Sequence, residues 1–113
     1  MIIKPIPKHL LPHTVEYEEY QEGDGITKES GFLPAVTLSF VRVQYQSIIK
    51  KTNNSEDELF DAILFYDVVN SSSSSDFTFT KKSKITHNGK TMAIEKVNPV
   101  EAFKLHHYEI GMK

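Results

Sequence analysis

KITHNGKTMAIEKV, residues 84–97, is the stretch that decides the fold. It consists of two strand-like runs on either side of Asn88 and Gly89. Asn-Gly is the pair best suited to the positive φ angles of a type I′ turn, whose twist matches that of the paired strands. The stretch therefore predicts an antiparallel hairpin with its turn at Asn88 and Gly89.

The residues that follow this hairpin predict one more strand. Asn98-Pro99 is expected to break the ladder of hydrogen bonds, because proline has no N–H group to donate. Residues 100–104 are then expected to form a crossover, and a final strand over residues 105–110 is expected to end at Gly111.

Three segments before the hairpin also have strand-like patterns. Residues 14–20 and residues 35–45 alternate apolar and polar side chains, which is typical of strands with one buried face. In the second segment the alternation changes phase at Phe40-Val41, which predicts a β-bulge or a bend. Residues 62–69 predict a further strand, because they are rich in β-branched and aromatic side chains.

Polar segments separate these strands. Residues 21–34 are expected to form a loop longer than a minimal hairpin turn. Flexible loops are expected near residues 46–58 and 70–82, and the five serines of residues 71–75 are too polar and uniform to be expected to pack. The Phe-Thr-Phe run at residues 77–79 is most simply explained if both aromatic side chains face the core.

The composition is that of a small β-rich domain. The chain has 113 residues, of which 26 are Val, Ile or Thr and only 11 are Ala or Leu, which argues against a helical bundle. We therefore expect a single domain over residues 1–113. Its fold class is all-β, mainly antiparallel: a six-strand barrel or sandwich with at most one short helix, near residues 55–58, where the sequence fits a capping box. The absence of cysteine excludes disulfides and thiolate metal sites.

Residues 1–12 are expected to form an extended arm ahead of a barrel core that spans residues 13–113. Three of the five prolines lie in this arm, where they fix φ and remove backbone donors. Its apolar side chains argue against a solvated tail, so the arm either covers an edge of its own domain or reaches a neighbouring subunit. The residues expected to make this contact are Ile3, Pro5, Ile6, Pro7, Leu10 and Leu11.

No constellation of catalytic or metal-binding residues is expected. His9 and His13 have the i, i+4 spacing of a helical chelate, but Pro12 blocks a regular helix between them. His106 and His107 are adjacent on a predicted strand and are expected to point to opposite faces. The serines lack a Gly-x-Ser-x-Gly motif. We therefore expect no enzyme activity, no metal and no cofactor.

The charge pattern gives no overall drive towards nucleic acid or membranes. The formal net charge is -2, from 13 basic and 15 acidic residues. No apolar run is long enough to span a membrane, and the first residues do not resemble a signal peptide. Two basic clusters, at Lys50-Lys51 and residues 81–84, lie beside predicted loops, where they either keep the protein soluble or contact a phosphate backbone.

Three stretches together resemble a known family. They are PIPKHLLPHTV (residues 5–15), LFYDVVNS (residues 64–71) and KSKITHNGK (residues 82–90), the last followed by residues 97–99 and 105–110. With these stretches the chain resembles the minor capsid protein family of tailed phages and prophages of Gram-positive bacteria. More loosely, it is similar to the head-closure, or stopper, proteins of the head-tail connector.

The resemblance implies a small β-barrel that assembles as a ring on the portal vertex after DNA packaging, closes the channel and provides a platform for the tail. It implies a structural virion protein of the neck, made in the host cytoplasm. The implied partners are other copies of the chain, the portal or an adaptor protein, and a tail-terminator or tail protein. Packaged DNA would be contacted without sequence-specific binding, and no membrane is implied.

The surfaces that contact DNA or other proteins are predicted from the residues themselves and not from the resemblance. Residues 50–57 join two predicted strands without apolar anchors and are the first candidate for a channel-facing loop, at Lys50, Lys51, Asn53 and Asn54. Residues 71–82 are the second candidate. Two other functions stay open: a tail-terminator or other neck protein, and a single-stranded nucleic-acid-binding β-barrel with basic loops.

Overall fold

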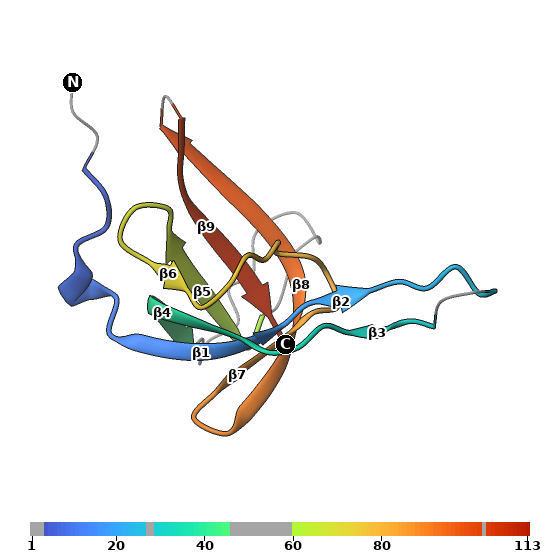
Figure 1. Cartoon of the computed structure of the whole chain (residues 1–113). Coiled ribbons are helices and arrows are strands. Elements are labelled where there is room, and N and C mark those ends of the chain that lie inside the picture. Colours follow the sequence, from blue (N-terminus) through green and yellow to red (C-terminus); the bar gives the residue numbers. More distant parts are fainter. Residues whose placement is uncertain (1–3, 27–28, 46–59, 103) are drawn as a thin grey trace, which may run out of the picture.

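The computed structural model describes residues 4–26, 29–45, 60–102 and 104–113. The predicted loop near residues 46–58, with the predicted helical turn at residues 55–58, lies outside these ranges. Within the described residues the chain forms one 3₁₀ helix and nine strands, and every strand pairing is antiparallel (Figure 1). The elements are η1 (Lys8–Leu10), β1 (His13–Glu18), β2 (Tyr20–Gln21), β3 (Gly31–Phe32), β4 (Val36–Tyr45), β5 (Ala62–Asp67), β6 (Ser72–Ser73), β7 (Lys84–His87), β8 (Lys90–Ala102) and β9 (Lys104–Met112).

Six of the strands close into a barrel. Neighbouring strands follow in the order β1-β7-β8-β9-β5-β4, and β4 also pairs with β1, which closes the ring of strands. The two-residue strand β6 adds to β4 outside this ring, and β2 and β3 form a separate two-stranded sheet. The predicted all-β fold is therefore confirmed. Because β4 pairs with β1, the fold is a closed barrel rather than a sandwich.

Two local predictions are confirmed by the backbone. Asn88 and Gly89 have φ angles of 50° and 82° in the turn between β7 and β8, as a type I′ turn requires. Phe40 has a φ of 55°, and the register of β4 against β1 shifts beside it. The change of phase in the sequence is therefore a β-bulge. Val41, just after it, pairs with both β1 and β5, and the remaining residues of β4 pair with β5.

The prediction that Asn98-Pro99 breaks the ladder is wrong. β8 runs through both residues, with Asn98 opposite Glu109 and Pro99 opposite Tyr108. The predicted crossover over residues 100–104 is likewise replaced by the ends of β8 and β9. β7 pairs with the first four residues of β8, so Pro99 lies on a stretch with β9 as its single partner strand, where a missing N–H group is tolerated.

The prediction that the last strand ends at Gly111 is also wrong, because β9 continues to Met112. Gly111 is buried and pairs with Ile63 on one side and Lys96 on the other. A Cβ added at this position would lie 2.6 Å from the ring of Phe60. Glycine is needed here because the ring of Phe60 lies directly over its backbone, not because the strand stops.

The serine run packs against the barrel, contrary to the prediction. Ser71 is buried, and its hydroxyl donates to the carbonyl of Phe40. Ser72–Ser73 form β6, and Ser74 Oγ accepts the N–H group of Thr37 over 2.9 Å. These short polar side chains satisfy backbone groups along β4, so their polarity does not prevent packing. The flexibility expected of residues 70–82 stays a prediction.

The barrel interior is filled by apolar side chains. They are Val15, Tyr17, Val36, Leu38, Val41, Val43, Ala62, Leu64, Phe79, Ile85, Met92, Ile94, Ile110 and Met112. Phe77 and Phe79 face this core as predicted, although neither lies in a strand. Phe79 is in ring contact with Tyr17, Tyr66 and Tyr108, which extends the core into an aromatic cluster.

The predicted loop over residues 21–34 contains a projecting hairpin instead. β2 and β3 pair at its base, and the hairpin extends away from the barrel (Figure 1). The rings of Tyr20 and Phe32 meet edge to face, with 5.5 Å between their centroids. Lys82 Nζ lies 5.5 Å from the ring centre of Tyr20, and Lys84 Nζ lies 4.2 Å from that of Phe32. Two lysines of the basic cluster therefore hold the base of the hairpin.

Candidate functional site

The described part of the arm is anchored on its own barrel. The N–H group of Ile6 donates to Asp67 Oδ1 over 3.0 Å, and the side-chain amide of Asn70 donates to the carbonyl of Ile6 over 2.7 Å. Leu11 is only 1% exposed. These contacts are those of an arm that covers its own domain, which is the first of the two alternatives.

Asp67, at the end of β5, is the centre of this anchoring. Its side chain is completely buried, and its carboxylate accepts the N–H groups of Ile6, Val69 and Asn70. Three backbone donors offset the cost of burying a carboxylate. They come both from the arm and from the turn after β5, so one carboxylate fixes the arm and the turn together.

His106 and His107 lie side by side, so the prediction that they point to opposite faces is wrong. Their Nδ1 atoms are 2.8 Å apart, because a bulge in β9 inserts His106 between residues that pair with β8. His107 Nε2 lies 2.9 Å from Glu109 Oε2. His106 Nε2 lies 2.7 Å from the carbonyl oxygen of Lys4, in the arm.

These three contacts need three N–H groups on two imidazole rings. A carboxylate and a carbonyl can only accept, so each outer contact needs a hydrogen on the ring nitrogen, and the contact between the two Nδ1 atoms needs one more. Two neutral imidazoles carry two N–H groups. They can therefore make two of the three contacts at a time, and the tautomer of each ring decides which two.

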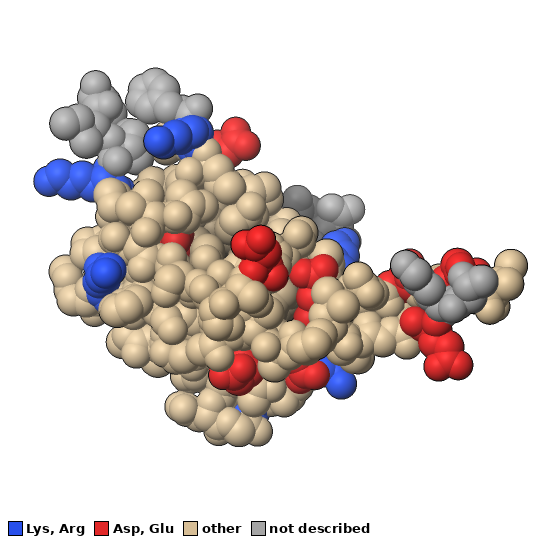
Figure 2. Space-filling model, viewed as in Figure 1, with Lys and Arg blue, Asp and Glu red and all other residues tan. Residues whose placement is uncertain are grey.

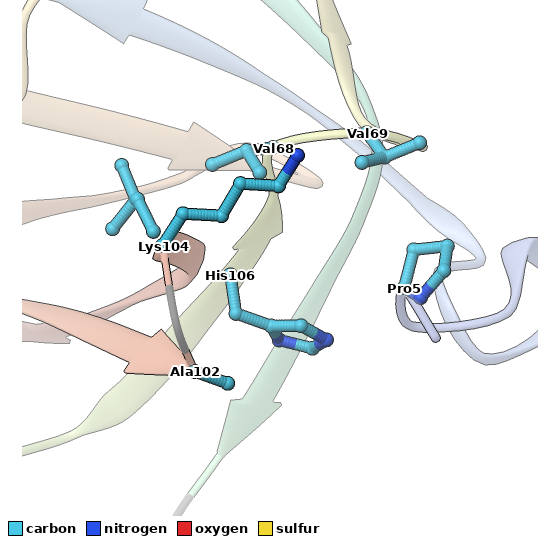
Figure 3. A pocket seen from close by; sticks show the side chains of 7 residues that line it. Pro5, Val68, Val69, Ala102, Lys104 and His106 are labelled. Carbon is cyan, nitrogen blue, oxygen red and sulfur yellow. The ribbon is translucent and has the colours of Figure 1, made fainter. Parts of the chain in front are cut away.

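A small notch opens beside the anchored arm, between the turn after β5 and the end of the β8–β9 hairpin (Figure 3). Its volume is about 50 Å³. This is several times the roughly 10–15 Å³ that one water molecule needs. Its lining is mostly apolar and consists of Pro5, Val68, Val69, Ala102, Lys104, Leu105 and His106. Val69 is 65% exposed, so the notch presents apolar surface to the solvent.

The opposite end of the molecule carries the tip of the β2–β3 hairpin, residues 22–26 (Figure 1). Ile26 is 92% exposed, and its N–H group donates to Asp24 Oδ1 over 2.8 Å. Glu22 forms an exposed ion pair with Lys82 at 3.8 Å. Figure 2 shows further acidic side chains along the hairpin. The tip therefore combines one exposed aliphatic side chain with an acidic surrounding.

A second histidine pair lies at the seam where β1 meets β4. His13 Nδ1 accepts the N–H group of Val43 over 3.0 Å, and the rings of His13 and His87 are 4.7 Å apart. His87 Nδ1 lies 2.8 Å from the hydroxyl of Tyr45. Burial lowers the pKa of His13, and His87 and Arg42 lower it further. His13 is thereby favoured in the neutral form that accepts a hydrogen bond across the seam.

The predicted arm residues have different surroundings. Ile6 and Leu11 contact the barrel, and Pro5 lines the notch. Pro7 and Leu10 are exposed. Contact of the arm with a neighbouring subunit therefore stays a prediction for its exposed residues.

The candidate channel-facing residues Lys50, Lys51, Asn53 and Asn54 lie outside the described residues, as does Ile3 of the arm. Among the residues that the structure describes, no group of three or more His, Cys, Asp and Glu side chains could hold a metal ion. In the same part of the chain, no helix is long and apolar enough to cross a membrane.

The residues that hold the arm were not found from the sequence. Asp67 falls within a predicted strand, although an aspartate followed by Asn70 three residues later is typical of a turn. His106 has no such signal, because its bond to the arm depends on a bulge. Ile26 could have been noticed as an isolated aliphatic residue in a polar, glycine-rich segment.

The comparison with protein families gives a match over most of the chain. The family model described as minor capsid protein matches residues 7–112. Searches among curated proteins and among solved structures give no match. The chain therefore belongs to the phage minor capsid protein family and is a structural component of the virion.

Proposed function

We propose that this minor capsid protein acts at the head-tail junction, where it closes the portal channel after DNA packaging and provides a platform for the tail. The observation that supports this role most directly is a contrast within the molecule. The barrel interior is filled with side chains, whereas the two most exposed large apolar side chains of the described residues are Ile26, in the segment between β2 and β3, and Val69, in the turn after β5. These two elements lie at opposite ends of the molecule (Figure 1). Such a molecule offers contact surfaces on two sides, as a layer between head and tail requires.

The proposed partners are other virion proteins and the packaged DNA. Copies of the chain form a ring, with the portal or an adaptor protein on the head side and a tail-terminator or tail protein on the other. The exposed arm residues Pro7 and Leu10 are proposed to contact a neighbouring subunit or the adaptor, because they are apolar and face the solvent. From the sequence alone, Lys50, Lys51, Asn53 and Asn54 are proposed to face DNA in the channel without sequence-specific binding.

A phage with an amber codon in the gene for this chain tests the role. Non-suppressing hosts are expected to yield heads that package DNA and then lose it, together with tails of normal length that are not joined to heads. The measurements are nuclease sensitivity of the packaged genome and electron microscopy. The wild-type chain supplied from a plasmid should restore sealed heads. An antibody label directed against this chain should mark a single vertex of each head.

Other outcomes of this experiment separate the rival neck functions. Sealed heads with tails of irregular length would assign the protein to tail termination. Sealed heads joined to normal tails would contradict both roles.

Two of the lysines that favour a nucleic-acid-binding barrel are engaged within the protein. Lys82 and Lys84 lie over the rings of Tyr20 and Phe32, where they compete with the stacking of bases. We therefore expect no salt-sensitive binding of a single-stranded oligonucleotide at low micromolar concentration, measured by fluorescence anisotropy. Clear binding that weakens with salt would favour this alternative over the connector role.

A further inference from the structure

We propose that copies of this chain join head to tail, with Ile26 at the hairpin tip of one copy seated in the notch of the next. The inference rests on the proposed function, since a ring at the portal vertex needs contact surfaces that repeat from copy to copy. The β2–β3 hairpin and the elements whose residues line the notch lie at opposite ends of the molecule (Figure 1), so each copy uses both surfaces at once.

Ile26 has the properties of an inserted side chain. It is 92% exposed, so its insertion would remove nearly all of its apolar surface from water, which is the main favourable term in association. The hydrogen bond from its N–H group to Asp24 Oδ1 constrains the backbone just before it. A backbone that is constrained in this way loses less conformational freedom on binding.

The notch has the properties of a preformed receptor. Its lining is mostly apolar, and Figure 3 shows Val68 and Val69 on one side and Pro5, from the arm, beside them. The N–H group of Val68 donates to the carbonyl of His106 over 3.2 Å, and that of Val69 donates to Asp67. The turn that carries both valines is therefore held in place before a partner arrives.

The charges of the two ends are complementary. By sequence, residues 21–30 contain three acidic side chains and one basic side chain, namely Glu22, Asp24, Glu29 and Lys28. Glu22 is also paired with Lys82 at 3.8 Å. Lys104 and His106 line the notch, and Lys4 lies next to it through its contact with His106. The acidic neighbours are Glu101, which precedes Ala102 in the sequence, and Glu109, which contacts His107. Figure 2 shows basic side chains, with one acidic side chain beside them, at the end opposite the hairpin. Attraction between such surfaces steers association and weakens as salt is added.

The tip and the notch are different surfaces, so the contact between them is not self-complementary. Head-to-tail contacts of this kind close into a ring or continue as a filament, depending on the rotation between neighbouring copies. A two-fold dimer through the tip alone, or through the notch alone, would leave the other surface unused.

Disulfide trapping tests this contact, because the chain has no cysteine of its own. The test variant carries Ile26→Cys and Val69→Cys together. A disulfide needs the two Cα atoms within roughly 7 Å, and the two positions lie at opposite ends of one copy, so only contacts between copies are trapped. The matched control carries Ile26→Cys and Thr91→Cys, because Thr91 is exposed and lies next to the β7–β8 turn. The three single variants, Ile26→Cys, Val69→Cys and Thr91→Cys, serve as further controls.

Oxidation is carried out on the purified full chain at its highest soluble concentration, and on heads from the amber phage complemented with each variant. We expect the double variant to form a ladder of trimers and larger species on non-reducing gels. The single variants and the matched control are expected to give no species beyond a dimer. In solution, added salt should lower the yield of the ladder.

Two outcomes would overturn the inference. One is the absence of a ladder in heads that contain the double variant at the vertex. The other is a full yield of dimers from Ile26→Cys alone, which would indicate a two-fold contact. If the labelled protein is missing from the vertex, the proposed function fails instead, and the ladder in solution then decides the head-to-tail contact by itself.

Discussion

The two ends of the molecule are held by different kinds of contact. At the arm end, Asp67 accepts three backbone N–H groups and His106 contacts the carbonyl of Lys4. At the hairpin end, the projection is held at its base by the ring pair Tyr20–Phe32 and by two lysines above it. Loss of a buried acceptor leaves its donors unpaired, whereas loss of an exposed ring contact does not. Substitutions at the arm end should therefore destabilise the whole barrel. Substitutions at the hairpin end should increase the mobility of the hairpin and leave the barrel unaffected.

Removing the buried carboxylate should have the largest effect. Asp67→Ala leaves the N–H groups of Ile6, Val69 and Asn70 without their acceptor. We expect the free energy of unfolding to fall by about 3 kcal/mol, because each unpaired buried donor is costly. Denaturant unfolding measures this. The control is Asp61→Ala. Asp61 is exposed and directly precedes β5, so this variant should leave the unfolding midpoint nearly unchanged. Equal midpoints for the two variants would contradict the role given to Asp67.

The barrel was predictable because its signals are local in the sequence. The Asn88-Gly89 pair determines its own turn, and the change of phase at Phe40 is visible within a single strand. Alternation over residues 35–45 depends only on neighbouring side chains. Each of these signals needs no knowledge of which strands become neighbours.

The anchoring of the arm was not predictable, because its partners are far apart in the chain. Ile6 and Asp67 are separated by 61 residues, and Lys4 and His106 by 102. The error at Pro99 has a related cause. Whether a proline breaks a ladder depends on whether its strand has a second neighbour, and this is decided by the closure of the whole barrel.

His106→Ala is expected to destabilise the arm end less than Asp67→Ala does. It removes the contact with the carbonyl of Lys4 but leaves Asp67 in place. We expect a loss of about 1 kcal/mol, because the substitution removes this contact and the one with His107 Nδ1, neither of which is fully buried. Hydrogen exchange at the Ile6 amide reports on the arm alone, since its neighbours Pro5 and Pro7 have no N–H group, and it should become faster. His9→Ala, at an exposed arm position, is the control. Unchanged exchange at Ile6 would show that Asp67 holds the arm without help.

The hairpin end should respond to Lys84→Ala without any response at the arm. The substitution removes the ammonium group above the ring of Phe32, a contact that at a partly exposed site is worth about 0.5–1 kcal/mol. The N–H group of Leu33 donates to the carbonyl of Glu19 over 2.8 Å, so faster hydrogen exchange at Leu33 reports a loosened hairpin. Lys81→Ala is the matched control from the same basic cluster. Faster exchange at Ile6 as well would mean that the two ends are coupled, which would contradict their independence.

The smallest effect is expected from pH, at the seam next to the arm. Neutral His13 accepts the N–H group of Val43, and its pKa lies below 6.5 because of burial and, after that, because of His87 and Arg42. The folded state therefore binds fewer protons than the unfolded state just below this pH. The contribution of His13 is complete above about pH 6.5 and is lost as the pH falls through the lowered pKa of the folded protein.

Unfolding by denaturant between about pH 8 and about pH 5.5 measures this loss, and His13→Asn isolates it. Asparagine keeps a side-chain acceptor for Val43 but does not titrate, so the variant should lose less stability on acidification than the wild type. Losses caused by ionisable groups that do not contact His13 are common to both proteins and cancel in the difference. His87, whose ring centroid lies 4.7 Å from that of His13, belongs to the seam under test. His9→Asn should behave like the wild type, because His9 is exposed in the arm. If His13→Asn loses as much stability as the wild type, the seam is not the site of the acid sensitivity. Hydrogen exchange at Leu33 should show no difference between His13→Asn and the wild type at any of these pH values, because the contacts that hold the hairpin do not include His13.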